Sequence, residues 1–181
     1  MRGADLSAFS PRLALGIRLH RRVDALFDVH PAMVSLKALV DPDLRRYAGI
    51  LCDVFLDHVL LSQWGDWHSA SIENFTSGVY ASLGRMAPAL PEATRTAAER
   101  IARFDALTSC ASRAGVAATL GRIARRLKRP TDLAAGVATL ERHGERLAAE
   151  LPPIFADVRS GALAYLGSSL TMRPSELSVS R

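Results

Sequence analysis

The chain has 181 residues, 49% of them hydrophobic and 23% charged, with a formal net charge of +5. This length and composition predict one soluble domain with a substantial core and exclude a fibrous or disordered class of protein. No apolar run is long enough to span a membrane, residues 2–9 lack the apolar core of a signal peptide, and two cysteines cannot build a disulfide framework. We therefore expect a cytoplasmic protein. Its net positive charge indicates an acidic partner, but the charge alone does not show whether that partner is a nucleic acid, a membrane or a protein.

Apolar residues recur at helical spacing along nearly the whole chain, and no segment shows the alternation of a strand. Ser10 with Pro11, and Asp41 with Pro42, are typical of helix starts, and His30 is a further candidate cap. We predict a single compact multi-helix, all-α domain over residues 1–167 and a disordered polar tail over 168–181. The predicted helices cover approximately residues 11–28, 32–40, 42–64, 72–86, 92–107, 116–129, 133–151 and 154–166, with a break at Pro152–Pro153.

The segment from Cys52 to Trp64 is apolar on nearly all sides of a helical wheel, which is typical of a buried helix. Asp53 and Asp57 lie one turn apart on one stripe of this helix, with Trp64 beside them. His58 projects about 100° away from Asp57. Two like charges on a buried stripe are costly unless something compensates them. The candidates are a divalent metal ion, a pair of arginine side chains, or protonation.

The first predicted helix offers a matching set of side chains. His20 and Asp24 are four residues apart and share a face, which Asp28 continues. Two helices that direct His and Asp side chains into one space can bind Mg²⁺ or Mn²⁺, and less readily Zn²⁺ or Fe²⁺. Such an ion could activate a water and hold a phosphoryl oxygen. The alternative is a structural network in which His20 is a core histidine and the carboxylates pair with nearby arginines, namely Arg21, Arg22, Arg45 and Arg46.

Two blocks of sequence, "GIRLHRRVDALFDVHP" and "YAGILCDVFLDHVLLSQW", resemble the acyl carrier protein phosphodiesterase family. The resemblance rests on a His-Arg-x-x-Asp step over residues 20–24 and an Asp-x-x-x-Asp-His step over residues 53–58, with Trp64 following. It continues more weakly to about Val158. The family is all-helical and related to the HD-type metal phosphohydrolases, so the resemblance implies an HD-like fold.

The resemblance also implies a reaction. Family members hydrolyse the phosphodiester that joins 4′-phosphopantetheine to a serine of holo-acyl carrier protein, and they use a divalent metal, typically Mn²⁺ or Mg²⁺. Matching the motifs makes Arg21 a candidate contact for the substrate phosphate, and it makes Asp53, Asp57 and His58 catalytic candidates. The implied metal ligands are His20, Asp24, Asp53, Asp57 and His58.

The chain departs from the family pattern in two places. Members usually begin with another helical segment that carries a Gly-Asn…Asp-Phe element, and this chain begins just after the place where that element should end. Ala106 and Cys110 stand where aromatic residues are expected. The leading interpretation is an active phosphodiesterase. The alternatives are an N-terminally truncated, non-catalytic carrier-protein-binding homologue, and an HD-type phosphohydrolase of nucleotides or small phosphoesters.

The segment over residues 116–129 predicts an amphipathic helix. Its arginines are expected to form one basic stripe opposite an apolar face, and like charges so close together repel by a few tenths of a kcal/mol per pair. The stripe could steer an acidic carrier protein, or it could be a solvated face. Nucleic acid is a weaker match, because no aromatic platform accompanies the charges. The arginines of the predicted partner surface are Arg122, Arg125, Arg126 and Arg129.

Overall fold

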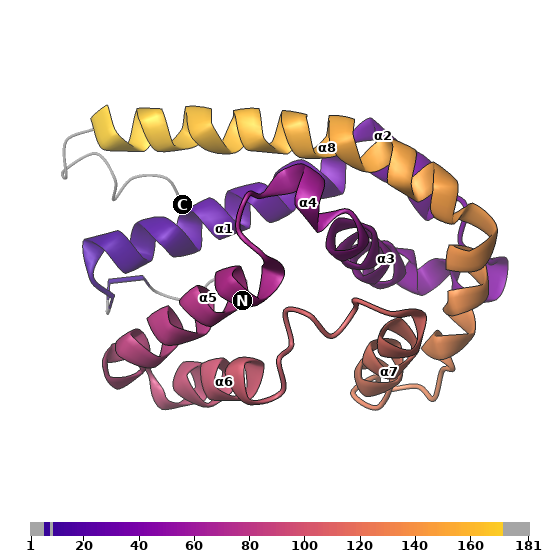
Figure 1. The fold of residues 1–181 in the computed structure, drawn as a ribbon, viewed down its shortest axis with the longest axis horizontal. Coiled ribbons are helices and arrows are strands. Elements are labelled where there is room, and N and C mark those ends of the chain that lie inside the picture. Colours follow the sequence, from indigo (N-terminus) through magenta and orange to yellow (C-terminus); the bar gives the residue numbers. More distant parts are fainter. Residues whose placement is uncertain (1–5, 8, 172–181) are drawn as a thin grey trace. The chain divides into compact units, whose positions relative to one another are not determined.

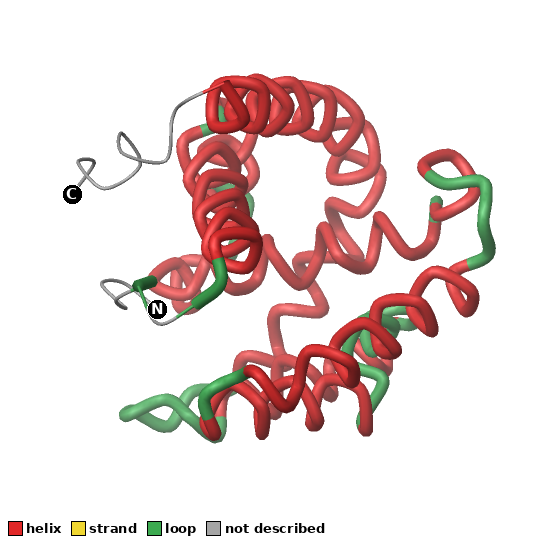
Figure 2. Tube along the Cα trace, turned by 90° about the vertical axis from the view of Figure 1, so that its left-hand side faces the viewer, coloured by secondary structure: helices red, strands yellow, loops and turns green. Residues whose placement is uncertain are grey.

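A computed structural model describes residues 6, 7 and 9–171, and in this part of the chain it contains helices and loops but no strand (Figures 1 and 2). The all-α prediction is therefore confirmed. The α-helices are α1 (Pro11–Val29), α2 (Pro31–Lys37), α3 (Ala48–Ser62), α4 (Trp64–Trp67), α5 (Ile72–Met86), α6 (Glu92–Arg103), α7 (Arg113–Ala124) and α8 (Val137–Thr171). Three 3₁₀ helices join them, η1 (Pro42–Tyr47), η2 (Ala87–Ala89) and η3 (Leu133–Gly136).

The chain divides into two compact units. We call Leu36–Leu151 the central unit, and Met1–Ser35 together with Pro152–Arg181 the terminal unit. Helix α8 begins in the central unit and ends in the terminal unit. The expectation of a single domain over residues 1–167 stays a prediction.

In the terminal unit, α1 contacts the C-terminal part of α8 where the latter carries Gly161. A Cβ atom at this glycine would lie 2.8 Å from Cδ1 of Leu26, so the absence of a side chain allows the close approach. His30 caps the start of α2, since its Nδ1 accepts a hydrogen bond from the backbone N–H of Ala32 at 3.2 Å. Its Nε2 therefore donates to the carboxylate of Asp157 on α8, also at 3.2 Å.

The core of the central unit forms around α3, which contacts α7, and around η3, which also contacts α7. The helix is buried on most of its sides, as its apolar sequence predicts. The core side chains of these elements that are no more than 1% exposed are Leu51, Cys52, Phe55, Val116, Leu120 and Leu133. Gly136 of η3 lets this layer close, because a Cβ atom there would lie 2.6 Å from Cδ2 of Leu51.

The helix predicted over residues 42–64 is divided into η1, α3 and α4, so that prediction is wrong in its continuity. Asp41 does not cap the segment with its side chain. Instead its carboxylate accepts hydrogen bonds from Arg142 at 2.6 and 2.7 Å and from Thr139 at 3.3 Å. A tertiary ion pair with α8 therefore uses the group that sequence reasoning assigned to local capping.

The break predicted at Pro152–Pro153 is also wrong, because α8 continues through both residues. Proline inside a helix costs about 3 kcal/mol, since it removes a backbone donor and crowds the preceding turn. The flanking Leu151 and Ile154 are 2% and 0% exposed. Their burial favours the helical backbone on both sides and offsets that cost. The same helix extends to Thr171, past the expected start of the tail at residue 168, and residues 172–181 of that tail lie outside the described residues.

Candidate functional site

The carboxylates of Asp53 and Asp57 stand on α3 and reach solvent, although their helical neighbours Cys52 and Val54 are buried. Sequence reasoning placed both carboxylates inside the core, and this expectation is wrong. Surrounding protein nevertheless desolvates Asp57, and this desolvation, together with the nearby charge of Asp53, raises the pKa of Asp57 to about 6. A carboxyl group that is both accessible and partly desolvated is suited to bind a cation or hold a proton.

His58 of α3 is held in one orientation by a hydrogen bond to the backbone. Its Nδ1 lies 2.7 Å from the carbonyl oxygen of Cys110. A carbonyl oxygen can only accept, so Nδ1 carries the proton and the neutral ring keeps its lone pair on Nε2. Metal-binding and basic histidines are commonly fixed in this manner, by donating the other ring N–H to a carbonyl or carboxylate.

The loop that supplies the Cys110 carbonyl is itself tightly held. Asp105 has a positive φ of 44°, a rare backbone conformation for a residue other than glycine. Its carboxylate accepts hydrogen bonds from the hydroxyl groups of Tyr80, at 2.6 Å, and Thr108. A Cβ atom at Gly115 would collide with the carbonyl oxygen of Ser109, so glycine is required where the loop meets α7. These contacts fix the acceptor for His58.

On α1, His20 and Asp24 form the pair that their spacing predicts. Nδ1 of His20 lies 3.3 Å from Oδ1 of Asp24, and the two side chains are 77% and 61% exposed. The alternative of a core histidine is therefore wrong. Arg21 is half-buried. Arg18, which sequence reasoning missed, has a buried Nε atom without a hydrogen-bond partner among the described residues, and its spacing of three from Arg21 on the same helix was the available signal.

The two sets of predicted ligands lie on different units, with α1 in the terminal unit and α3 in the central unit. Their convergence on one ion stays a prediction. Within each unit taken by itself, the described residues contain no group of three or more His, Cys, Asp or Glu side chains that could hold a metal ion.

An aromatic group follows the site on α3. The ring of Trp64 lies 5.6 Å from that of His68 and 5.0 Å from that of Phe75, and its Nε1 donates to the carbonyl oxygen of Ala70 at 2.8 Å. Trp64, which belongs to the motif of the second sequence block, therefore has a structural role. It ties the turn after α3 to the start of α5.

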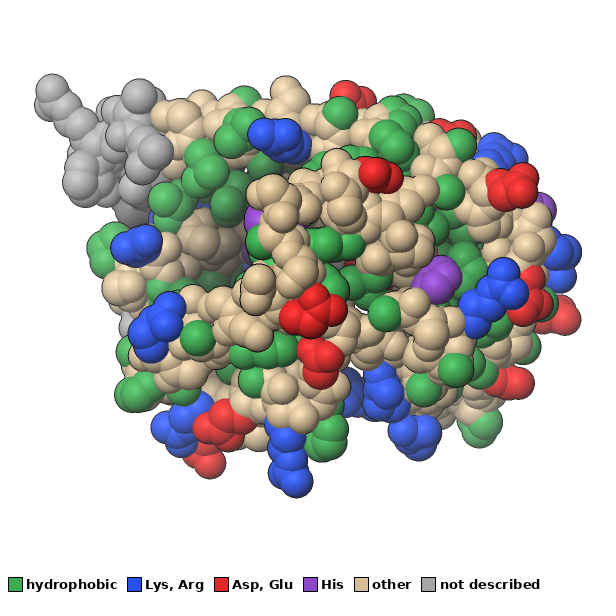
Figure 3. Space-filling view, in the orientation of Figure 1, with side chains coloured by type: hydrophobic (Ala, Val, Ile, Leu, Met, Phe, Trp, Pro, Cys, Tyr) green, Lys and Arg blue, Asp and Glu red, His purple; other side chains and the backbone are tan. Residues whose placement is uncertain are grey.

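The four arginines of the predicted partner surface are all exposed, but they do not form one helical stripe. Helix α7 ends at Ala124, so Arg126 and Arg129 lie beyond it in turns and bends. The last turn tightens because the N–H groups of Arg126 and Leu127 donate to carbonyls three residues earlier, at 2.9 and 3.0 Å. Figure 3 shows Lys and Arg side chains along the lower edge of the view, where α6 and α7 lie, with Asp and Glu side chains among them.

The family assignment comes from comparison with known proteins. A family model described as acyl carrier protein phosphodiesterase matches residues 1–158. The chain belongs to this family. No helix in the described part of the chain is long and apolar enough to cross a membrane.

Curated relatives of the family match shorter parts of the chain. The acyl carrier protein phosphodiesterase of Photorhabdus laumondii is 39% identical over 64 residues, which cover 35% of this chain and 32% of the relative. That of Serratia proteamaculans is 33% identical over 92 residues, which cover 50% and 48%. The chain thus spans between about a third and about half of the length of these relatives. No solved structure matches it significantly, and the HD-like fold stays a prediction.

Proposed function

We propose that this protein hydrolyses the phosphodiester between 4′-phosphopantetheine and a serine of holo-acyl carrier protein. The products are the apo-carrier protein and free 4′-phosphopantetheine. The family supports the substrate, and one observation supports catalysis by this chain. It is the hydrogen bond from His58 Nδ1 to the Cys110 carbonyl, which leaves Nε2 available to a metal ion or a proton; the accessible carboxylate of Asp57 belongs to the preceding residue of α3.

The residues fit a divalent ion such as Mn²⁺ or Mg²⁺ by their chemistry. Asp53, Asp57 and His58 of α3 carry oxygen and nitrogen donors of the kind that such an ion binds. They form no metal-holding group by themselves within the central unit, and we propose that they bind an ion together with His20 and Asp24 of α1. A bound ion would supply a water of lowered pKa and stabilise charge on the phosphoryl group. A cation would also relieve the repulsion between Asp53 and Asp57 and displace the proton that Asp57 holds below about pH 6.

Two arginines of α1 are suited to the phosphoryl oxygens. Arg21 occupies the position at which the family motif implies a phosphate contact. The buried Nε of Arg18 has no hydrogen-bond partner among the described residues. A guanidinium group can donate two parallel hydrogen bonds to a phosphate. We propose that both side chains orient the diester. The exposed arginines at the end of α7 would attract an acidic carrier protein. We place the reaction in the cytoplasm, whose reducing conditions suit the two unpaired cysteines of the chain.

Mass spectrometry of purified holo-acyl carrier protein tests this proposal, because loss of the prosthetic group changes the carrier's mass. We expect conversion to the apo form with Mn²⁺ and the wild-type protein, and at least about a hundredfold slower conversion with His58→Gln, given the usual contribution of a positioned acid or base. His68→Gln, on an exposed histidine in the same unit, is the matched control and should retain activity. Conversion by His58→Gln at the wild-type rate would remove His58 from the site. Hydrolysis of nucleotides without hydrolysis of the carrier would favour a different phosphohydrolase.

A further inference from the structure

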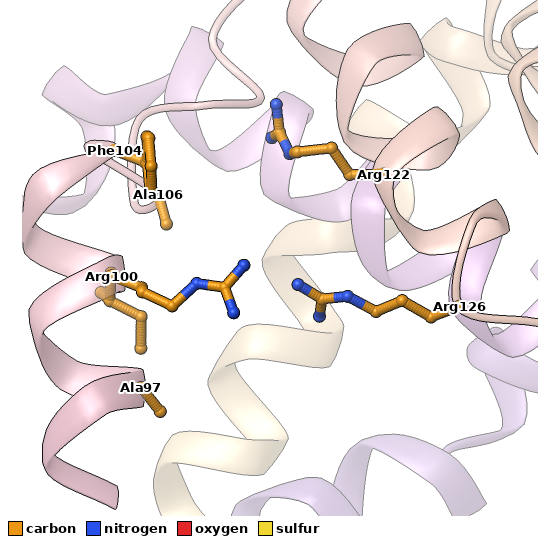
Figure 4. A pocket seen from close by; sticks show the side chains of 7 residues that line it. Ala97, Arg100, Phe104, Ala106, Arg122 and Arg126 are labelled. Atoms are coloured by element: carbon orange, nitrogen blue, oxygen red, sulfur yellow. The ribbon is translucent and has the colours of Figure 1, made fainter. Parts of the chain in front are cut away.

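A groove of about 580 Å³ lies between α6 and α7 in the central unit. One side of the groove is lined by Arg100 and Ile101 of α6 and by Phe104, which directly follows α6. The other side is lined by Arg122 of α7 and by Arg126, which lies just beyond the end of α7. Figure 4 shows the guanidinium groups of Arg100 and Arg126 directed toward one another across the groove. The groove therefore combines converging positive charge with apolar walls.

The two facing arginines lack an acidic partner among the described residues. Within the described part of the chain, neither Arg100 nor Arg126 makes an ion pair or a hydrogen bond through its guanidinium group. Arg122 is anchored to its own helix, where it donates to the hydroxyl of Thr119 at 2.7 Å. Like charges that face one another repel, and an oxyanion between them would remove the repulsion and accept hydrogen bonds from both.

Exposed apolar side chains accompany the positive charges of the groove. Phe104 is 63% exposed and Ile101 is 37% exposed, and both line the groove. Leu107, which lies outside it, is 41% exposed. Arg103 lies over the ring of Phe104, 5.4 Å from its centroid. Arginine and aromatic residues are the types enriched at the centres of protein interfaces. The exposed apolar area of Phe104 and Ile101 beside the arginines is more than a small anion needs.

We infer that the groove between α6 and α7 is where the acyl carrier protein docks, through an acidic amphipathic segment. A carboxylate of that segment would lie between Arg100 and Arg126, and its apolar side chains would cover Phe104 and Ile101. The inference rests on the proposed function for the identity of the partner. It replaces the helical stripe with a defined groove, adds Arg100 and Phe104 to the surface, and leaves Arg125 and Arg129 outside it.

Charge reversal at neighbouring arginines separates docking from general attraction. Arg126→Glu and Arg125→Glu change the net charge equally, at adjacent exposed positions, but only Arg126 lines the groove. Affinity for holo-acyl carrier protein is measured by calorimetry in EDTA, so that binding is observed without turnover. We expect Arg126→Glu and Arg100→Glu to raise Kd by at least about tenfold and Phe104→Ala by about tenfold. Arg125→Glu should raise it by less than about threefold.

The outcomes distinguish the groove from the proposed reaction. If Arg126→Glu and Arg125→Glu weaken carrier binding equally, the groove is not the docking site. The same conclusion follows if the wild-type protein does not bind the carrier. A charge swap tests the contact directly. If a carrier variant in which one carboxylate residue is replaced by lysine binds Arg126→Glu better than the unchanged carrier does, the docking groove is supported. Hydrolysis of bis(p-nitrophenyl) phosphate should be equal in the wild type and in Arg126→Glu. Carrier binding through the groove by a protein that hydrolyses no diester would support the docking surface and contradict the proposed reaction.

Discussion

Asp57→Asn should make the metal-free protein more stable at neutral pH, because it removes a charge from a partly desolvated place beside Asp53. The pKa of Asp57 is raised from its ordinary value of 3.8 to about 6. A raised carboxyl pKa means that the folded state holds the proton more tightly than the unfolded state does. The penalty for ionising Asp57 is therefore absent below about pH 3.8, grows between 3.8 and 6, and is complete above about pH 6.

The full difference between these two pKa values corresponds to about 3 kcal/mol. Because the side chain reaches solvent, screening reduces this value, and we expect the substitution to gain about 1 kcal/mol at pH 7.5. For a chain of this size such a gain raises Tm by about 2–4 °C. Asparagine has nearly the shape of aspartate, so packing should change little.

Urea unfolding in EDTA at pH 4, 6 and 7.5 measures the effect. The stability difference between Asp57→Asn and wild type should be near zero at pH 4 and should grow toward pH 7.5. Glu99→Gln, on an exposed position of α6, removes the same charge and controls for the change in net charge. The reasoning would be refuted if Asp57→Asn were less stable than wild type at pH 7.5. It would also be refuted if the difference in stability between the two proteins did not change with pH, because ionising the Asp57 carboxyl would then carry no cost.

Two further substitutions, with Gly121→Ala as a control for the first, test contacts of the central unit. Gly136→Ala should lower the free energy of unfolding by about 1–3 kcal/mol, because its Cβ would lie 2.6 Å from the fully buried Leu51. Gly121→Ala, in open space on α7, should instead raise the free energy of unfolding by about 0.5–1 kcal/mol. Equal effects of the two substitutions in denaturant titrations would contradict the contact with Leu51. Arg142→Ala should lower Tm at pH 7, because the hydrogen bond and charge of Arg142 hold the pKa of Asp41 below its ordinary value of 3.8. That loss should shrink as the pH falls through the lowered pKa, and a Tm difference that persists unchanged in acid would contradict the ion pair.

Local signals in the sequence were sufficient for most helices. Helix α5 has the bounds that apolar spacing predicts, and Ser10 accepts from the N–H of Leu13 as a cap should. The motifs also identified His58 and Asp57 as the side chains of interest. These features depend on neighbours within a turn or two, which a sequence displays directly.

The remaining features depend on residues far apart in the chain. The acceptor for His58 is a backbone carbonyl 52 residues away, and a carbonyl leaves no mark on the residue type at Cys110. Asp41 resembles a cap until Arg142 is placed beside it, 101 residues later. The end of α7 and the pairing of Arg100 with Arg126 across a groove likewise arise from packing, which periodicity does not encode.

The most direct test of the central claim is the conversion of holo-acyl carrier protein to its apo form by the purified protein, followed by mass spectrometry. EDTA is added during the reaction, and Mn²⁺ in excess is added afterwards. We predict that the wild type converts the carrier in the presence of Mn²⁺, stops when EDTA is added and resumes with excess Mn²⁺. Asp57→Asn should convert the carrier at no stage. Conversion that continues in EDTA would contradict the metal site, and a carrier that keeps its prosthetic group under every condition would contradict the proposed reaction.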